Sequence, residues 1–406
     1  MRRGLKILGR GLGGAALGLL ALVAGLLLSA ASRRGAGAPG PPAARWAPDS
    51  ARVQVAAGPE YAAGPLWRAL WGAHHRALWA TPVSAPVLRL GPGGPDGLRP
   101  LRAGGSYQTR SLRLRAANGH EFVLRSVDKD ARPALPAGWV RRLLGPLMRD
   151  QTCAGHPYGA YVAARLAQSA GVLHTNPRLV YLPDDPALGP FRASHGRALY
   201  LLEERPAGDQ RHAPTLGASA RVVGSAEMLA AVGRGPASPA TARAFLRARL
   251  LDLWLGDWSR RPDQWRWATR PAAGAGPPEF RPIPRDRDQA FFQMNDGFYP
   301  WLIGQCRARY QSFGPCLTAA NVAALAATAR PLDTLLLRGL PATAFQQEAL
   351  LLRQRLGDAA IDSALQAGPP ETRSAIAAEL RPALRARRAQ LPAVAGWFYE
   401  AVNRKK

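Results

Sequence analysis

The stretch from Phe245 to Phe291 limits the possible folds more than any other part of this chain. It opens with an amphipathic run whose apolar residues recur at helical spacing, and continues from Gly256 as a polar loop that leads into an aromatic-rich strand. After a Pro/Gly/Ala connector, a second short strand ends in two carboxylates, Asp286 and Asp288. The predicted order is therefore helix, polar loop, strand, strand and acidic pair.

This order resembles the catalytic loop and metal-binding aspartate of kinase-like proteins, in particular the spore-coat kinase (CotH) family and the secretory-pathway casein-kinase-like enzymes. Their loop runs Gly-Asn-x-Asp-x-His and then Asn or Glu, and the next strand closes on Asp-x-Asp and a Phe. Gly256 matches the glycine, Gln264 falls on the Asn/Glu position, and Asp286 and Asp288 fall on the acids before Phe291. The resemblance implies ATP as the nucleotide and Mg or Mn as the metal, held by Asp286, Asp288 and Gln264, because hard oxygen ligands suit these ions.

The loop also departs from the family pattern. Asp257 stands where the family has Asn, the catalytic Asp falls on Ser259, and the His falls on Arg261. A general base would then be Asp257 or Asp263, which are displaced by two or four residues from the family position. Because the positioning of the reacting groups supplies most of the catalysis in phosphoryl transfer, such a displacement is a handicap. We expect an exported kinase-like protein that binds nucleotide and metal, and whose phosphotransfer is reduced or lost. The alternatives are a non-catalytic pseudokinase and a purely structural scaffold of the cell envelope. The sequence alone therefore does not decide whether the protein is an enzyme.

Residues 86 to 130 are predicted to form strands. The segment 111–115 alternates polar and apolar residues with the period of a strand, and Asn118-Gly119 after it is a strong hairpin signal. The segment 121–127 is then the partner strand.

The resemblance implies a phosphate site on this hairpin. Gly104 and Gly105, with Gln108, resemble the Gly-Gly-x-Gln of the secretory-pathway kinases, although Gln108 lies one residue further from the glycine pair. A kinase-like site also needs a cation on its third strand. Arg125 and Lys129 are the two candidates for this role, and Arg can bind phosphate in a bidentate manner. Lys129 could instead pair with a neighbouring aspartate on the surface.

Two further segments complete the expected nucleotide site. Asp150 is the acid best placed to pair with the strand cation. The segment 199–204, LYLLEE, resembles the hinge between kinase lobes, where an adenine would dock, and implies Glu203 as a nucleotide-binding residue. An ordinary core strand is the alternative for this segment.

The first 32 residues indicate export. Basic residues precede an uncharged apolar run at positions 11–32, which is typical of a cleaved signal peptide or of an uncleaved anchor. We expect the remainder on the periplasmic or extracellular side, either released by cleavage or anchored in the inner membrane through this segment.

The rest of the chain is about 355 residues long, which is more than a single hydrophobic core usually stabilises, so two lobes are expected. We predict an α+β, two-lobed, protein-kinase-like fold with a helical C-terminal extension. The expected parts are a signal or anchor at 1–32, a Pro/Gly linker at 33–49, an N-terminal helical segment at 50–84, an N-lobe at 85–205, a C-lobe at 206–316, and the helical extension at 317–406.

The net charge of +27 does not make nucleic acid the expected partner. The basic residues are nearly all Arg, are spread along the chain, and accompany abundant Ala, Gly and Pro, which indicates a composition bias. An exported protein also meets little nucleic acid, whereas a basic surface suits anionic lipid headgroups. The expected partners are a nucleotide, a protein or other substrate of the envelope, and the membrane through the N-terminus.

Three cysteines are present, and their spacing does not indicate zinc. In an oxidising compartment Cys306 and Cys316 are predicted to form a disulfide, leaving Cys153 as a buried thiol.

Overall fold

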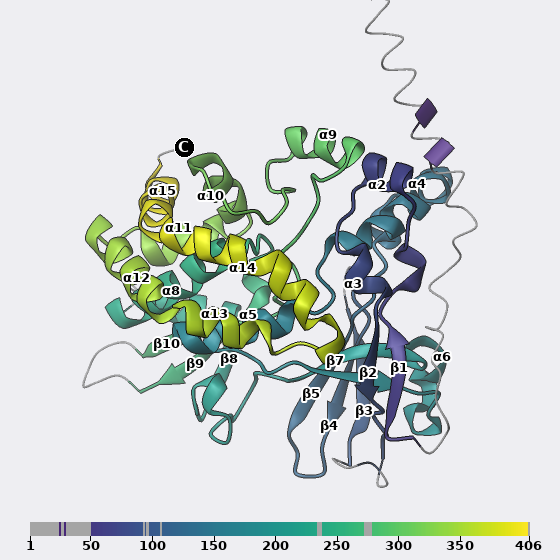
Figure 1. Cartoon of the computed structure of the whole chain (residues 1–406). Helices are drawn as coiled ribbons and strands as arrows, with labels where there is room; N and C mark the ends of the chain where they lie inside the picture. Colours follow the sequence, from purple (N-terminus) through teal and green to yellow (C-terminus); the bar gives the residue numbers. More distant parts are fainter. Residues whose placement is uncertain are drawn as a thin grey trace, which may run out of the picture.

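The computed structural model describes residues 24–25, 28–29, 50–91, 94, 97–105, 108–233, 238–271 and 278–404. In this part of the chain the larger antiparallel sheet lies on one side and most of the helices lie on the other (Figure 1). The fold is therefore mixed α and β, as the sequence predicts.

The larger sheet has five antiparallel strands. Their order across the sheet is β3 (Arg99–Gly104), β4 (Ser111–Arg115), β5 (Glu121–Ser126), β7 (Ala198–Glu204) and β6 (Arg178–Leu182). The predicted hairpin joins β4 to β5: Gly119 at its tip has a φ of 86°, and the backbone N–H of Ala116 donates to the oxygen of His120 over 2.8 Å. An Asn-Gly turn supplies this left-handed backbone at little steric cost.

The two faces of this sheet differ in character. Leu112, Leu124 and Leu202 occupy neighbouring register positions and belong to a buried apolar cluster on one face. Arg125 directly follows Leu124, and Glu203 directly follows Leu202, so both project from the other face, toward the helices. Strand alternation thus sends charged groups to the side on which the helical region packs.

Residues 50–84 contain strands as well as helices. Arg52–Ala56 (β1) pairs with Pro82–Pro86 (β2), and Val53, Val55, Val83 and Ala85 are buried, whereas Gln54 and Ser84 between them are not. This alternation favours a strand over a helix. Between the two strands lie the short helices α2 (Pro65–Trp71) and α3 (Arg76–Ala80).

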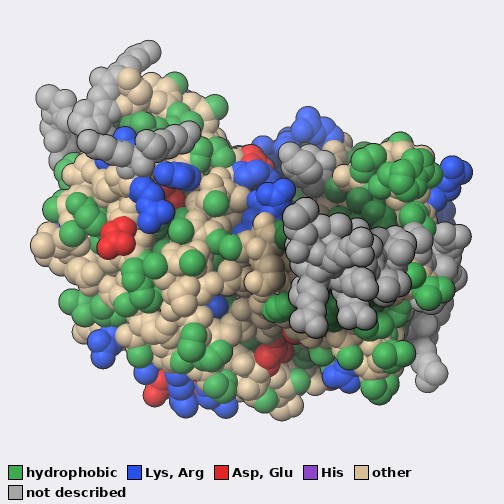
Figure 2. All heavy atoms as spheres, turned by 90° about the horizontal axis from the view of Figure 1, so that it is seen from above, with side chains coloured by type: hydrophobic (Ala, Val, Ile, Leu, Met, Phe, Trp, Pro, Cys, Tyr) green, Lys and Arg blue, Asp and Glu red, His purple; other side chains and the backbone are tan. Residues whose placement is uncertain are grey.

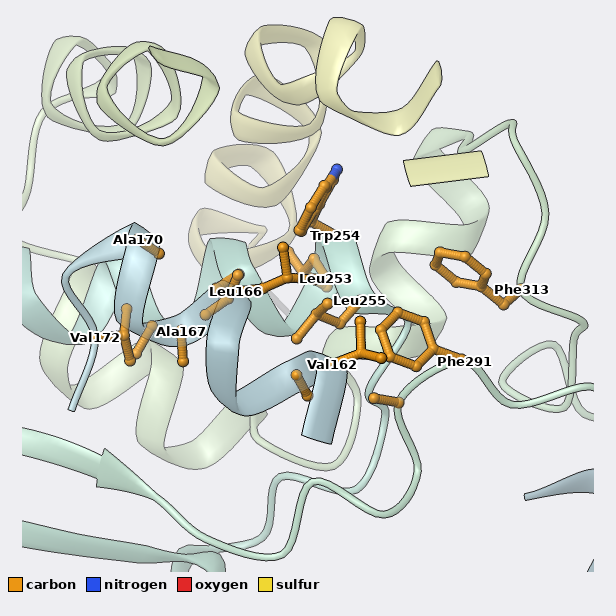
Figure 3. Close-up of a cluster of buried hydrophobic side chains, with 14 of the residues drawn as sticks. Val162, Leu166, Ala167, Ala170, Val172, Leu253, Trp254, Leu255, Phe291 and Phe313 are labelled. Atoms are coloured by element: carbon orange, nitrogen blue, oxygen red, sulfur yellow. The ribbon is translucent and has the colours of Figure 1, made fainter. Parts of the chain in front are cut away.

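The helical region is built around α8 (Pro239–Leu255) and α5 (Gly159–Ala170). Figure 3 shows Val162, Leu166 and Ala167 of α5 beside Leu253 and Leu255 of α8. Helix α8 begins at the N-cap residue Ser238, whose side chain accepts from the Thr241 N–H, and ends at Gly256 with a φ of 70°. Phe291, whose N–H donates to the Leu255 oxygen over 3.0 Å, closes this core beside Phe313.

The helices of residues 317–406 share that core. Arg387, in α14 (Arg373–Ala389), donates to the Trp254 oxygen over 3.1 Å, and so satisfies a carbonyl at the C-terminal end of α8. The other helices of this region are α10 (Ala319–Ala326), α11 (Arg330–Leu337), α12 (Ala342–Arg355), α13 (Asp358–Leu365) and α15 (Leu391–Asn403). They form part of the main body rather than a separate unit.

A second, three-stranded sheet carries the loops of the expected site. Its order is β10 (Glu279–Pro284), β9 (Trp265–Arg270) and β8 (Val222–Gly224). The other helices are α4 (Trp139–Asp150), α6 (Arg192–His195), α7 (Ser225–Val232) and α9 (Phe298–Cys306).

Three expectations about the surface and the chain ends can be compared with the structure. The predicted export segment and linker lie almost entirely outside the described residues, among which no helix is long and apolar enough to span a bilayer. Cys306 and Cys316 are free and exposed, so the predicted disulfide is wrong: the loop between them runs inward, where Phe313 packs on Phe291. On the face seen in Figure 2, the Lys and Arg side chains of the described residues form several separate groups.

Candidate functional site

Two ion pairs connect the five-stranded sheet to the loop after β10. The Nη1 of Arg125 lies 3.0 Å from Oδ2 of Asp286, and the Nζ of Lys129 contacts Oδ2 of Asp288. Lys129 and Asp288 are 159 residues apart in the sequence. Arg125 and Lys129 were alternatives in the sequence, and the structure uses both, one for each aspartate.

Lys129 does not pair with its neighbours in the chain. Asp128 is held by Arg149, and Asp130 by Arg132 over 2.8 Å. These competing pairs leave Lys129 directed at Asp288.

The strand cation has a second carboxylate near it, but not the expected one. The Nε of Arg125 lies 4.0 Å from Oε2 of Glu203, a buried residue that also accepts from the Thr175 hydroxyl over 3.0 Å. Asp150 instead receives two hydrogen bonds from Arg76, over 2.8 and 2.6 Å. The sequence pointed to Glu203 because this carboxylate directly follows the apolar residues of β7.

Asp286 has an unusual backbone. Its φ is 59°, a left-handed conformation that Asp tolerates better than most residues. Arg260 secures this turn by donating to the main-chain oxygens of Arg285, over 2.6 Å, and Asp286, over 3.3 Å. With its amide nitrogen turned toward the site, Gln264 donates to Oδ2 of Asp286 over 3.2 Å.

The two aspartates differ in proton affinity. Burial by itself would raise the pKa of Asp286, but the charges of Arg125 and Lys129 outweigh it and hold the pKa below its ordinary value. Burial and the charge of Asp286 raise the pKa of Asp288, against the opposing charge of Lys129. Asp286 is therefore the carboxylate that stays charged.

The predicted base residues do not converge on this pair. Asp257 is fully buried, and its carboxylate forms an ion pair with Arg260 and accepts from the Ser259 N–H over 3.3 Å. Burial raises the pKa of Asp257 to about 6. Asp263 is exposed and pairs with Arg261 over 3.1 Å, whereas Ser259 is half-buried in the loop.

Asp257 belongs instead to a buried ionic network. Asp252 of α8 lies 2.9 Å from Arg249 and 2.7 Å from Arg287, and Arg249 reaches Asp333 of α11 over 2.7 Å. Because a buried charge is tolerated only when it is paired, this network fixes the loop rather than exposing a base.

The glycine pair lies at the sheet edge next to the Lys129 segment. Gly105 has a φ of 105°, and a Cβ there would lie 2.0 Å from the Thr109 oxygen, so this turn requires glycine. Gly104 ends β3, and the exposed Gln108 accepts the Asp130 N–H at its main-chain oxygen over 2.9 Å.

Comparison with known proteins gives only distant likenesses. No family model and no curated protein matches the chain. A Helicobacter pylori proinflammatory kinase, CtkA, is 12% identical with a TM-score of 0.36, over 76% of this chain and 97% of that one. HipA in a Shewanella oneidensis complex with HipB and operator DNA is 15% identical with a TM-score of 0.32, over 80% and 79%. WaaP in complex with acyl carrier protein is 12% identical with a TM-score of 0.28, over 73% and 88%. All three TM-scores are below 0.5.

Proposed function

We propose that this chain is a kinase-like protein that binds a nucleotide and a divalent metal between the five-stranded sheet and the loop after β10. The pairing of Arg125 with Asp286 carries this proposal. A cation on the third strand of a sheet and a carboxylate after a distant strand are the two groups that hold phosphate and metal in kinase-like sites. Nothing in the local sequence forces these two groups together.

The residues present fit a hard divalent ion. Asp286 and Asp288 supply oxygen ligands of the type that Mg and Mn prefer. Gln264 presents its amide nitrogen to Asp286 and its oxygen to Arg261, so it would have to turn its amide to become a ligand. The Oδ1 atom of Asp286 is buried and has no hydrogen-bond partner among the described residues, which is consistent with a place for a cation. When bound, such an ion would neutralise phosphate oxygens, while Arg125 and Lys129 would turn from the aspartates to the phosphates.

The residues at the expected base positions do not favour catalysis. Ser259 offers a hydroxyl where the family has a carboxylate, Asp257 is held by Arg260, and Asp263 is paired at the surface. We therefore propose reduced or absent phosphotransfer, and a non-catalytic role in the cell envelope as the second candidate. Both roles assume that the protein is exported. A reporter that works only after export should be active when it is joined at residue 60. An active cytosolic reporter at the same position would contradict export.

Thermal unfolding of the purified protein tests the binding site. ATP with Mg or Mn should raise Tm more than either alone, because a ligand that binds only the native state stabilises it. Asp286→Asn should remove this joint effect while keeping the fold, since Asn adopts left-handed backbone as readily as Asp. Asp263→Asn removes an exposed carboxylate and serves as the matched control. Joint stabilisation that survives Asp286→Asn would overturn the proposed site.

A further inference from the structure

A second group of arginines lies beside the Arg125–Asp286 pair. Strand register pairs Arg113 of β4 with Val123 of β5, and Val123 with Glu203 of β7. Arg113 therefore shares the helix-facing side of the sheet with Arg125. Arg102 of β3 is in turn the register partner of Arg113.

The three-stranded sheet contributes two more arginines. Arg266 of β9 is the register partner of Ile283, and the Arg285 N–H donates to the Gln264 oxygen over 2.9 Å, extending the same ladder. Gln264 ends the turn before β9, and its backbone bond to Arg285 continues the β9–β10 pairing by one residue, so Gln264 and Arg285 lie next to the Arg266–Ile283 register pair. The Gln264 amide in turn contacts Asp286.

Arg113, Arg266 and Arg285 lack the partners that nearby arginines have. Arg115 and Arg205 share Glu121, over 3.0 and 2.9 Å, and Arg125 has Asp286. None of the described carboxylates forms an ion pair with Arg113, Arg266 or Arg285, although all three are half-buried. Arg266 donates only to main-chain oxygens, those of Trp265 over 2.8 Å and Asp263 over 3.5 Å.

These arginines also repel one another. The positive charge of Arg266 is opposed by those of Arg205 and Arg113. The positive charge of Arg285 is opposed by those of Arg125 and Arg266, against the attraction of Asp286 and Glu203. The pKa of Arg113 falls through burial and through the charges of Arg205 and Arg102. Guanidinium groups stay protonated in proteins, so this repulsion is a cost to the folded state.

We propose that Arg113, Arg266 and Arg285 form an oxyanion subsite that binds a phosphate group. Three guanidinium groups from two sheets offer the planar, multiple donors that match phosphate oxygens, and an anion there would offset their mutual repulsion. The inference goes beyond the proposed function, because it requires no metal at Asp286 and no phosphotransfer. The phosphate could belong to the nucleotide itself or to a second, phosphorylated ligand.

Calorimetric titration of the full chain with inorganic pyrophosphate, without divalent metal and at low ionic strength, tests this subsite. Wild type should bind, and Arg266→Gln and Arg285→Gln should each weaken binding at least about tenfold, as for the loss of one charge-assisted contact. Arg353→Gln on α12 removes an equal charge from an exposed position and should leave binding unchanged. Absence of binding to wild type, or equal losses in all three variants, would overturn the subsite.

The stability of the unliganded variants gives an independent readout. Arg266→Gln and Arg285→Gln should unfold at the same or a higher temperature than wild type, because each relieves repulsion. A lowered Tm in both would mean that these arginines are structural, which contradicts the proposal. Competition then identifies the source of the phosphate: displacement of pyrophosphate by ATP assigns the subsite to the nucleotide, and simultaneous binding assigns it to a second ligand. Because metal is absent, these results are independent of the Asp286→Asn test.

Discussion

The buried guanidinium of Arg260 donates to the main-chain oxygen of Arg285 over 2.6 Å, so the loop after α8 holds the turn that presents Asp286. The same guanidinium neutralises Asp257. One side chain therefore connects the two segments that kinase-like sites assign to the base and to the metal.

Arg260→Ala should destabilise the protein by about 3–5 kcal/mol, because it leaves the buried Asp257 without its counter-charge. Chemical denaturation measures the free energy of unfolding. Arg261→Ala breaks an exposed pair and should change it by no more than about 0.5 kcal/mol. Equal effects of the two substitutions would show that Arg260 does not hold the loop.

Ser259→Asp should create or raise phosphotransfer. The substitution places a carboxylate, in a half-buried loop, at the position that the resemblance assigns to the base, and a positioned general base contributes about 10²–10⁴-fold in rate. Release of phosphate from radiolabelled ATP or its transfer to protein can be followed with Ser259→Asn as the control of equal size. If wild type transfers phosphate well and Ser259→Asp adds nothing, the base lies elsewhere, and Asp257 is the first residue to test.

His156 should make stability depend on pH. Burial, with a smaller effect of His75, lowers the pKa of His156 from 6.5 to about 3, and its Nδ1 accepts the Tyr158 N–H over 3.1 Å. The unfolded chain therefore binds the proton more readily between these two values. The contribution of His156 to the free energy of unfolding is complete above about pH 6.5. It falls by at most about 1.4 kcal/mol per pH unit as the pH drops toward 3.

Denaturation of wild type and His156→Asn at a series of pH values measures this contribution. Asn can still accept the Tyr158 N–H but does not titrate, so the slope below pH 6.5 should be shallower in the variant. His212→Asn changes an exposed histidine and should keep the wild-type slope. Identical slopes in all three proteins would contradict the assignment to His156.

Alkylation should distinguish the three cysteines. Iodoacetamide is expected to modify Cys306 and Cys316 in the native protein, because both are exposed and free. Cys153 should react only after unfolding, since burial raises the pKa of its thiol and excludes the reagent. Peptide mass mapping reads the outcome, and a linked Cys306–Cys316 peptide would restore the disulfide that the sequence predicts.

Local patterns predicted the elements of the site better than its contacts. The alternation in 111–115 and the Asn118-Gly119 turn identify β4 and β5, and Gly256 marks the end of α8. By contrast, the sequence predicted an ion pair between Asp150 and the strand cation, whereas Asp150 pairs with Arg76 in the structure. Such pairings depend on which distant segments pack together, and several arginines compete for each acid. The repulsion among Arg113, Arg266 and Arg285 could not be predicted either, because a sequence does not give the register between distant strands.

The hydrogen bond from Arg387 to the end of α8 also sets an order of events during synthesis. Helix α14 is made long after α8, so the carbonyl of Trp254 has no such donor while the nascent chain is still growing. The C-terminal end of α8 should therefore gain this donor only after residue 387 has emerged, and a chain interrupted before that residue should be more open to proteases at this helix end.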